Sequence, residues 1–135
     1  MMGLLEMFGR KPAAEPKAAY TIATTISPLR LTAHRTEEAE IAVELTNNAS
    51  EARLTSLIVA LPKGISFDQI GLEAAREIRL GELTTGQTRT LNLKVWGGQR
   101  TEPGSYTIAI TALGHFRKYS YISSKTKKSL VLRVV

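Results

Sequence analysis

The C-terminal end of the sequence interleaves aromatic and basic side chains in a pattern that could bind an anion. Aromatic rings can stack on nucleobases, and lysine and arginine neutralise phosphates. The same residue types would also suit a sheet with a basic outer face, on which tyrosines pack across strands and charge serves solubility. Next to Phe116, this end supplies one candidate binding set: Arg117, Lys118, Tyr119, Tyr121, Lys125, Lys127 and Lys128.

The placement of charge along the chain is the reason for choosing these residues as a candidate binding set. The net charge is +6, from 18 Lys/Arg and 12 Asp/Glu. Residues 1–114 carry 12 Lys/Arg and all 12 Asp/Glu, so the whole excess lies in residues 115–135, where no acid occurs. A basic end on a neutral body favours an anionic partner.

Catalytic and metal chemistry find little support in the sequence. The two histidines, His34 and His115, are expected in separate loops, without metal-ligand spacing or paired carboxylates. Glu40 and Glu44 belong to the densest acidic group, and they fall on the outward face of a predicted strand, where solvated charge is normal. The chain has no cysteine, and signatures of nucleophile elbows, phosphate loops and dinucleotide sites are absent. We therefore expect no enzyme, no cofactor, no metal and no small-molecule substrate.

Alternating apolar and polar residues predict a series of short strands from Ala19 onward. In the clearest of these strands, Ile41, Val43 and Leu45 lie on one face. The expected strands span residues 20–26, 40–46, 54–61, 76–80, 88–96, 105–113 and 129–135.

Some segments are less regular. After Pro28, which cannot continue a strand ladder, Leu29 and Leu31 are expected to resume the strand in the other sheet. We expect a long connection that buries the apolar side chains of Ile65, Phe67 and Ile70, followed by one helical turn at residues 72–76. Near the C-terminal end we expect a strand at 116–123 and a turn at 124–126.

These elements predict an all-β fold. Seven or eight short strands, with turn signals at intervals of about 8–12 residues, favour an immunoglobulin-like antiparallel β-sandwich. A closed barrel is the alternative. The stretch from Gly81 to Leu113 is the centre of the pattern and reads as two strands of a half-buried sheet with a turn-rich connection. Trp96 is expected to cover the core at one end of the sandwich rather than to form a sugar-binding platform.

The N-terminal residues are distinct from the rest. Leu4, Leu5 and Phe8 share one face of a short helix that Gly9 and Pro12 would end, and an isolated helix of that length is marginal in water. We expect residues 1–18 to be a flexible tail and residues 19–135 to be the sandwich. In the alternative, the three apolar side chains form an amphipathic foot for a membrane surface or a partner groove.

The start of the chain lacks the order of a secretory signal. Glu6 interrupts its apolar part, and Arg10 and Lys11 follow that part instead of preceding it. No apolar run approaches the roughly 20 residues that a membrane-spanning helix needs. We expect a cytoplasmic protein that can lie at the membrane periphery, and an extracellular one only if a leader before Met2 has been trimmed.

Several consecutive motifs resemble those of a known group of modules. They are TNNAS, LTSLIVALPKGISF, IRLGELTTGQTRTLNLKV and EPGSYTIAITA. In this order they are similar to the immunoglobulin-like accessory domains of bacteria and archaea, including the CARDB-type cell-adhesion-related modules. The resemblance covers residues 19–135 and implies a non-catalytic module, usually extracellular and one of several in a longer chain. It also places Tyr106 as a tyrosine-corner residue, whose hydroxyl bonds back to the preceding turn, and Ile108 where an antibody domain has its second cysteine.

These observations lead to one expected function and one alternative. We expect a non-catalytic protein-interaction or scaffolding module that acts through an exposed sheet edge or the basic C-terminal hairpin, with a protein partner or as a homo-oligomer. The alternative is a binder of an anionic surface, membrane or nucleic acid, through the N-terminal foot and the basic C-terminal end.

Overall fold

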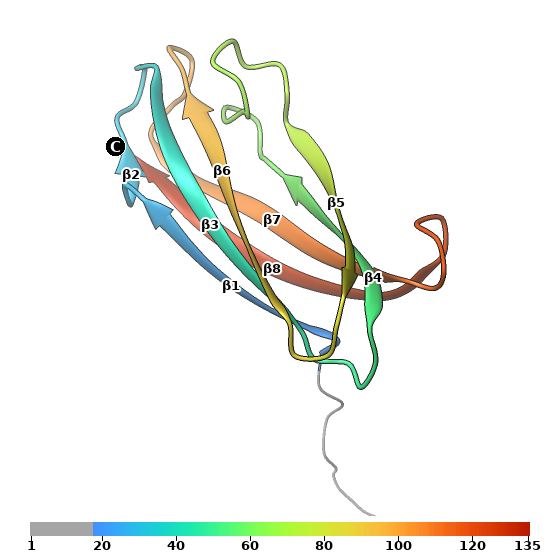
Figure 1. Ribbon diagram of the computed structural model, residues 1–135. Coiled ribbons are helices and arrows are strands. Elements are labelled where there is room, and N and C mark those ends of the chain that lie inside the picture. The colour runs from blue at the N-terminus through green and yellow to red at the C-terminus, as the bar shows by residue number, and fades with distance from the viewer. Residues whose placement is uncertain (1–17) are drawn as a thin grey trace, which may run out of the picture.

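Eight strands form two facing sheets in the computed structural model, which describes residues 18–135 (Figure 1). The three-stranded sheet has the order β1-β3-β6, with β1 (Tyr20–Ser27), β3 (Glu37–Asn47) and β6 (Thr88–Gly97). The five-stranded sheet has the order β2-β8-β7-β4-β5, with β2 (Arg30–Leu31), β8 (Ile122–Val134), β7 (Gly104–His115), β4 (Arg53–Ala60) and β5 (Ala75–Leu83).

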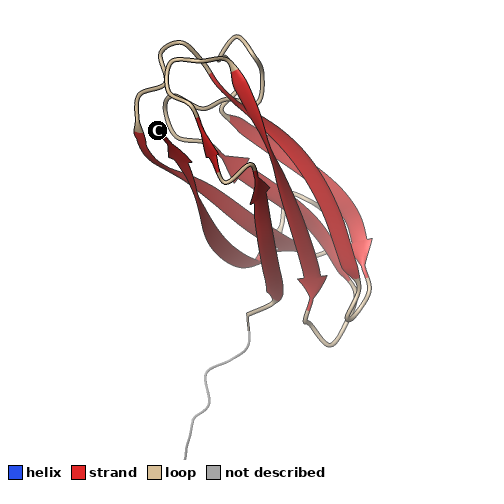
Figure 2. Ribbon diagram, turned by 90° about the vertical axis from the view of Figure 1, so that its left-hand side faces the viewer, coloured by secondary structure: helices blue, strands red, loops and turns tan. Residues whose placement is uncertain are grey.

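The described residues contain strands and loops only (Figure 2). No helix in them is long and apolar enough to cross a membrane. The prediction of an all-β, immunoglobulin-like sandwich of seven to eight strands is confirmed. The predicted tail and foot, with Leu4, Leu5 and Phe8, lie outside the described residues.

The core lies between the sheets and comes from the alternation seen in the sequence. Ile41, Val43 and Leu45 of β3 are fully buried, and they face Ile108 and Ile110 of β7, which are fully buried as well. Burying one such side chain stabilises the fold by roughly 1.5–3 kcal/mol. The intervening residues of β3 point to solvent, so the acidic residues predicted to form a solvated face do so.

After β1 the chain changes sheets, as the sequence predicts. β1 ends at Ser27, and Pro28 follows it. Leu31 is then buried in β2, which pairs in parallel with β8 through Arg30↔Arg133 and Leu31↔Val134. Because β2 has only two residues, it covers only the C-terminal end of β8.

The stretch from Gly81 to Leu113 supplies strands to both sheets rather than to one. β6 pairs with β3, whereas β7 pairs with β4 and β8. The connection between them is held by Thr101, whose hydroxyl donates to the Gly64 carbonyl at 2.7 Å and accepts from the Gly98 N–H at 2.8 Å. This turn-rich segment is therefore the crossing point between the layers.

The expected helical turn at residues 72–76 is wrong. The Asp68 carboxylate accepts the N–H groups of Leu72 and Glu73 at 2.8 and 2.9 Å, which holds this segment as a loop until β5 begins at Ala75. The pKa of Asp68 lies below its usual value, and the hydrogen bond from the Leu72 N–H contributes most to lowering it. Ile65 and Phe67 are buried as predicted, but Ile70 lies on this loop and is 77% exposed.

The predicted strand at 116–123 and turn at 124–126 are also wrong. Residues 116–121 form the tip of the β7–β8 hairpin, closed by the Phe116 N–H donating to the Tyr121 carbonyl at 2.9 Å. Arg117 has a φ of 69°, in the left-handed region that turns use and strands do not. β8 starts at Ile122, and residues 124–126, which were expected to form a turn, belong to this strand and pair with β7.

The tyrosine corner is confirmed. The Tyr106 hydroxyl donates to the Glu102 carbonyl at 2.6 Å, in the turn just before β7. Ile108, two residues later, is fully buried. This hydrogen bond joins the connection between β6 and β7 to the first residues of β7.

Replacing Tyr106 by phenylalanine should lower the free energy of unfolding by about 1 kcal/mol, because the ring stays and one intramolecular hydrogen bond is lost. Urea unfolding followed by fluorescence measures this change, and the slope against urea should be unaltered. An unchanged midpoint for Tyr106→Phe would show that the corner does not hold the connection.

Candidate interaction surface

Among residues 18–135, no strand lies beside most of one long side of β8. β8 runs from Ile122 to Val134, and β7 pairs with it along one side over almost its whole length. On the other side, β2 reaches only Arg133 and Val134. Within residues 18–135, the open side from 122 to 132 is a free sheet edge, which we call the β8 edge.

The backbone groups that face this edge can be assigned from the end of the strand. The Val135 N–H donates to the Leu31 carbonyl at 2.9 Å, and the Val135 carbonyl accepts from the Ala33 N–H at 2.8 Å, so Val135 points toward β2. Successive residues of a strand point their N–H and C=O groups to alternate sides. Because the register with β7 is unbroken from Val134 back to Ser124, the residues that point into the open side are Lys125, Lys127, Ser129 and Val131.

Basic side chains line this edge on both faces. Lys125 and Lys127 lie on the outer face, and both are exposed. Lys128 stands across from the inward-facing Ile110 but is exposed too, whereas Leu130 is half-buried and Leu132 is buried. Thr126 and Ser124, further along the same inner face, are half-buried, and the Tyr20 hydroxyl of β1 lies beside Gly114, the partner of Ser124, so Lys128 is an exposed position on an otherwise covered face. None of the three lysines forms an ion pair with a described carboxylate.

Tyr119 differs from the other residues of the candidate set, because it packs against β5 instead of pointing to solvent. Its hydroxyl accepts the Gly81 N–H at 3.0 Å, and the guanidinium of Arg79 lies 4.6 Å from its ring centre. Gly81 sits where the β4–β5 register shifts, with a φ of 75°, so the tyrosine pairs an N–H group at an irregular point of the ladder. Tyr119 therefore serves to fasten the hairpin.

His115 is a buried residue, which corrects its prediction as a loop residue. It is the last residue of β7, and its Nε2 lies 2.7 Å from the Ser56 hydroxyl. The Tyr119 ring packs against the imidazole in an edge-on arrangement, with 5.0 Å between the two ring centres. The Nδ1 atom is buried without a partner among the described atoms. Sequence reasoning missed this cluster, because a histidine directly before a turn carries no local sign that the turn folds back over it.

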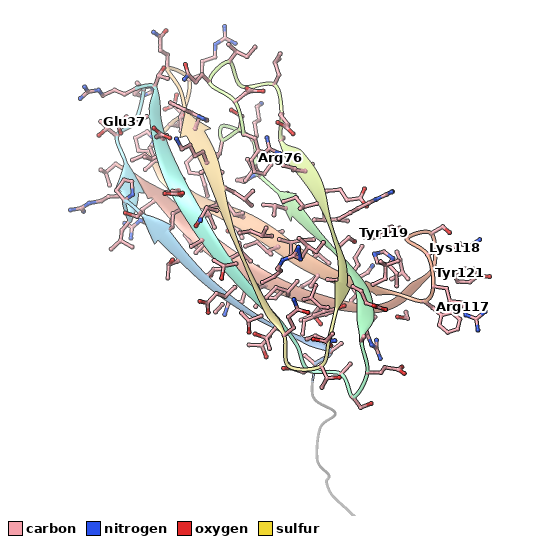
Figure 3. The ribbon with its side chains drawn as sticks, in the orientation of Figure 1. Glu37, Arg76, Arg117, Lys118, Tyr119 and Tyr121 are labelled. Atoms are coloured by element: carbon pink, nitrogen blue, oxygen red, sulfur yellow. The ribbon has the colours of Figure 1, made fainter. Side chains whose placement is uncertain are left out.

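The tip of the hairpin presents the remaining aromatic and basic side chains to solvent. Phe116, Tyr121 and Ile122 are 56%, 61% and 55% exposed. Arg117 lies 4.9 Å from the Phe116 ring centre, and Lys118 lies 5.6 Å from that of Tyr121. Figure 3 shows Arg117, Lys118 and Tyr121 at the outer end of the hairpin, with Tyr119 nearer the sheet.

The candidate set thus divides into three parts with different surroundings. Tyr119 is docked, the tip carries Arg117, Lys118 and Tyr121, and the β8 edge carries Lys125, Lys127 and Lys128. Acidic side chains gather elsewhere, on the outer face of β3, where Glu38 pairs with Lys94 of β6 at 3.4 Å. The two sheets therefore present outer faces of different charge.

A second feature lies at the opposite end of the sandwich from the hairpin tip. Half-buried Trp96, the residue before the last of β6, exchanges backbone hydrogen bonds with Ser66 and lines a cleft of about 680 Å³ together with Tyr106. His34 is exposed, 3.7 Å from the Glu102 carboxylate. No group of three or more potential metal ligands occurs within residues 18–135.

The docking of Tyr119 makes a direct prediction about stability. Tyr119→Phe should lower the free energy of unfolding by about 1 kcal/mol, because the Gly81 N–H loses its acceptor. The matched variant Tyr121→Phe removes the hydroxyl of an exposed ring and should change the value by less than about 0.5 kcal/mol. Chemical denaturation of both variants measures the difference, and equal effects would contradict the docking.

Comparison with known proteins adds little to this description. No protein family model and no curated protein matches the chain. Among solved structures, 12 chains match. One of them is the ASH/PapD-like domain of human CEP192 (PapD-like domain 7), which is 13% identical over 93% of this chain and 92% of that chain, with a TM-score of 0.42. The CARDB-type resemblance stays a prediction, and the immunoglobulin-like β-sandwich rests on the strands and sheets of the chain itself.

Proposed function

We propose that this protein is a non-catalytic protein-interaction module whose partner adds an extended strand to the β8 edge. The observation that carries the proposal is the length of that edge: β2 pairs only at Arg133 and Val134, and the preceding part of β8 has no neighbour among the described residues. An exposed sheet edge is a template for strand addition, in which main-chain hydrogen bonds supply affinity and alternate side chains supply specificity.

The edge is long enough for a weak to moderate complex. Lys125, Lys127, Ser129 and Val131 present an N–H and a carbonyl each to the open side. At a net 0.5–1.5 kcal/mol per hydrogen bond, these eight groups could contribute about 4–12 kcal/mol before the entropic cost of association is subtracted. That range fits a reversible interaction better than a permanent one.

The charges on the edge favour a different protein over a second copy of this chain. A two-fold symmetric pairing of two β8 edges would place the lysine-rich segments of both copies across from each other. Like charges directly opposite in a sheet are destabilising. We therefore prefer a hetero-partner to the homo-oligomer among the alternatives open from sequence.

The tip supports a second candidate, binding to an anionic surface. Phe116, Tyr121 and Ile122 are exposed beside Arg117 and Lys118, and apolar side chains flanked by cations suit the boundary of an anionic membrane. This site would place the protein at the membrane periphery. It uses the tip and not the β8 edge, so the two functions can be separated by substitution.

The variant Ser129→Pro tests strand addition at the edge. Proline removes the Ser129 N–H, which points to the open side, and leaves the hydrogen bonds to β7 in place. A peptide that alternates threonine and valine serves as a neutral β-strand probe. In the wild-type protein it should shift the amide resonances of Lys125, Lys127, Ser129 and Val131, and Ser129→Pro should weaken this binding at least about tenfold.

Ser129→Ala is the matched control, because it removes the hydroxyl and keeps the N–H. It should bind the probe as the wild type does. Circular dichroism establishes that both variants are folded. A folded Ser129→Pro variant that binds the probe as tightly as the wild type would refute strand addition at this edge.

A further inference from the structure

The lysines of the β8 edge restrict which strand can join it. Lysine on an exposed edge disfavours pairing with a like-charged strand, whereas a neutral strand can pair but forms no ion pairs with it. The strand that gains from these lysines is one that brings carboxylates to them. We infer, on the basis of the proposed function, that the partner supplies an acidic extended segment with a defined spacing of acids.

The spacing follows from the two faces of β8. In a strand added to the edge, residues opposite Lys125 and Lys127 carry their side chains on the outer face, beside those lysines. The residue opposite Lys128 has its side chain on the inner face, where Lys128 is exposed. Two acids two positions apart, followed directly by a third, would therefore meet all three ammonium groups.

One further position should be apolar. The residue opposite Leu130 faces the inner side of the sheet, where Leu130 is half-buried and packs against the core. An apolar side chain there would pack beside Leu130 and extend the core cluster toward the β8 edge. The segment thus reads acid-x-acid-acid-x-apolar if it runs parallel to β8, and the reverse if it runs antiparallel.

Within residues 18–135, no carboxylate pairs with the lysines of the edge. β1, the edge strand of the facing sheet on this side, carries no charged residue. Glu38, Glu40 and Glu44 of β3 lie on the outer face of the other sheet, and Glu38 is already paired, whereas the Glu37 carboxylate accepts the Thr32 N–H. The three ammonium groups are available to an incoming strand.

Two peptides test this inference with the full chain. One is a valine- and threonine-based strand with glutamate at the three acidic positions and leucine at the apolar one, and the other has glutamine in place of each glutamate. The glutamate peptide should bind about tenfold more tightly at low salt, with shifts centred on residues 125–131. The difference should shrink as salt is raised, because the lysines are exposed.

Charge reversal supplies the specificity test. In Lys125→Glu/Lys127→Glu/Lys128→Glu, the preference should invert, so that a lysine version of the peptide binds more tightly than the glutamate version. The matched control is Arg117→Glu/Lys118→Glu, which reverses charge at the tip. It should leave the ratio between the glutamate and glutamine peptides within about twofold of the wild-type ratio.

The outcomes separate the inference from the proposed function. Equal binding of the glutamate and glutamine peptides, with shifts along the β8 edge, would overturn the acidic partner and leave strand addition standing. Absence of edge shifts with every peptide would overturn both. Shifts confined to residues 116–122, or binding to vesicles with anionic lipid that Arg117→Glu/Lys118→Glu abolishes while no peptide binds, would overturn both in favour of the anionic-surface candidate.

Discussion

The pairing of β2 with the end of β8 is the constraint on which the proposed interaction surface depends. After Ser27 the chain leaves the three-stranded sheet, and only Arg30 and Leu31 form a ladder with the other sheet before the chain turns toward β3. This short pairing secures the C-terminus and buries Leu31 and Val134. It also leaves the long remainder of β8 without a neighbouring strand in the part of the chain that the structure describes. A longer β2 would have closed the edge, so one local feature of the chain path decides whether the sheet can accept another strand.

The hairpin that carries the edge is held in place at its tip end. Tyr119 accepts the Gly81 N–H, and its ring covers His115, which in turn meets Ser56. These contacts join the β7–β8 hairpin to β4 and β5, on the side of β7 away from the edge. One side of β8 is thus supported by a paired and docked sheet, while the other pairs, among the described residues, only at Arg133 and Val134. A rigid edge loses less entropy when a partner strand binds than a mobile one would.

Sequence reasoning was most successful where the evidence is local. Alternation located the buried faces of β3 and β4, and the break at Pro28 indicated the change of sheet. The tyrosine corner at Tyr106 came from the resemblance to immunoglobulin-like domains. Sequence reasoning failed where a side chain acts at a distance. Asp68 replaces a helical turn by a loop, and residues 116–121 form a tip because β8 pairs early with β7. The open edge could not be derived, because strand spacing does not reveal which strands are neighbours.

Hydrogen exchange along β8 measures directly whether the β8 edge is open. The amides of Lys125, Lys127, Ser129 and Val131 should exchange rapidly, because they point to solvent. The amides of Ser124, Thr126, Lys128 and Leu130 are bonded to β7 and should exchange about a thousandfold or more slowly. An open edge should therefore give fast and slow amides in alternation along one strand. Uniform protection of both sets would contradict it, because the edge would then already be paired.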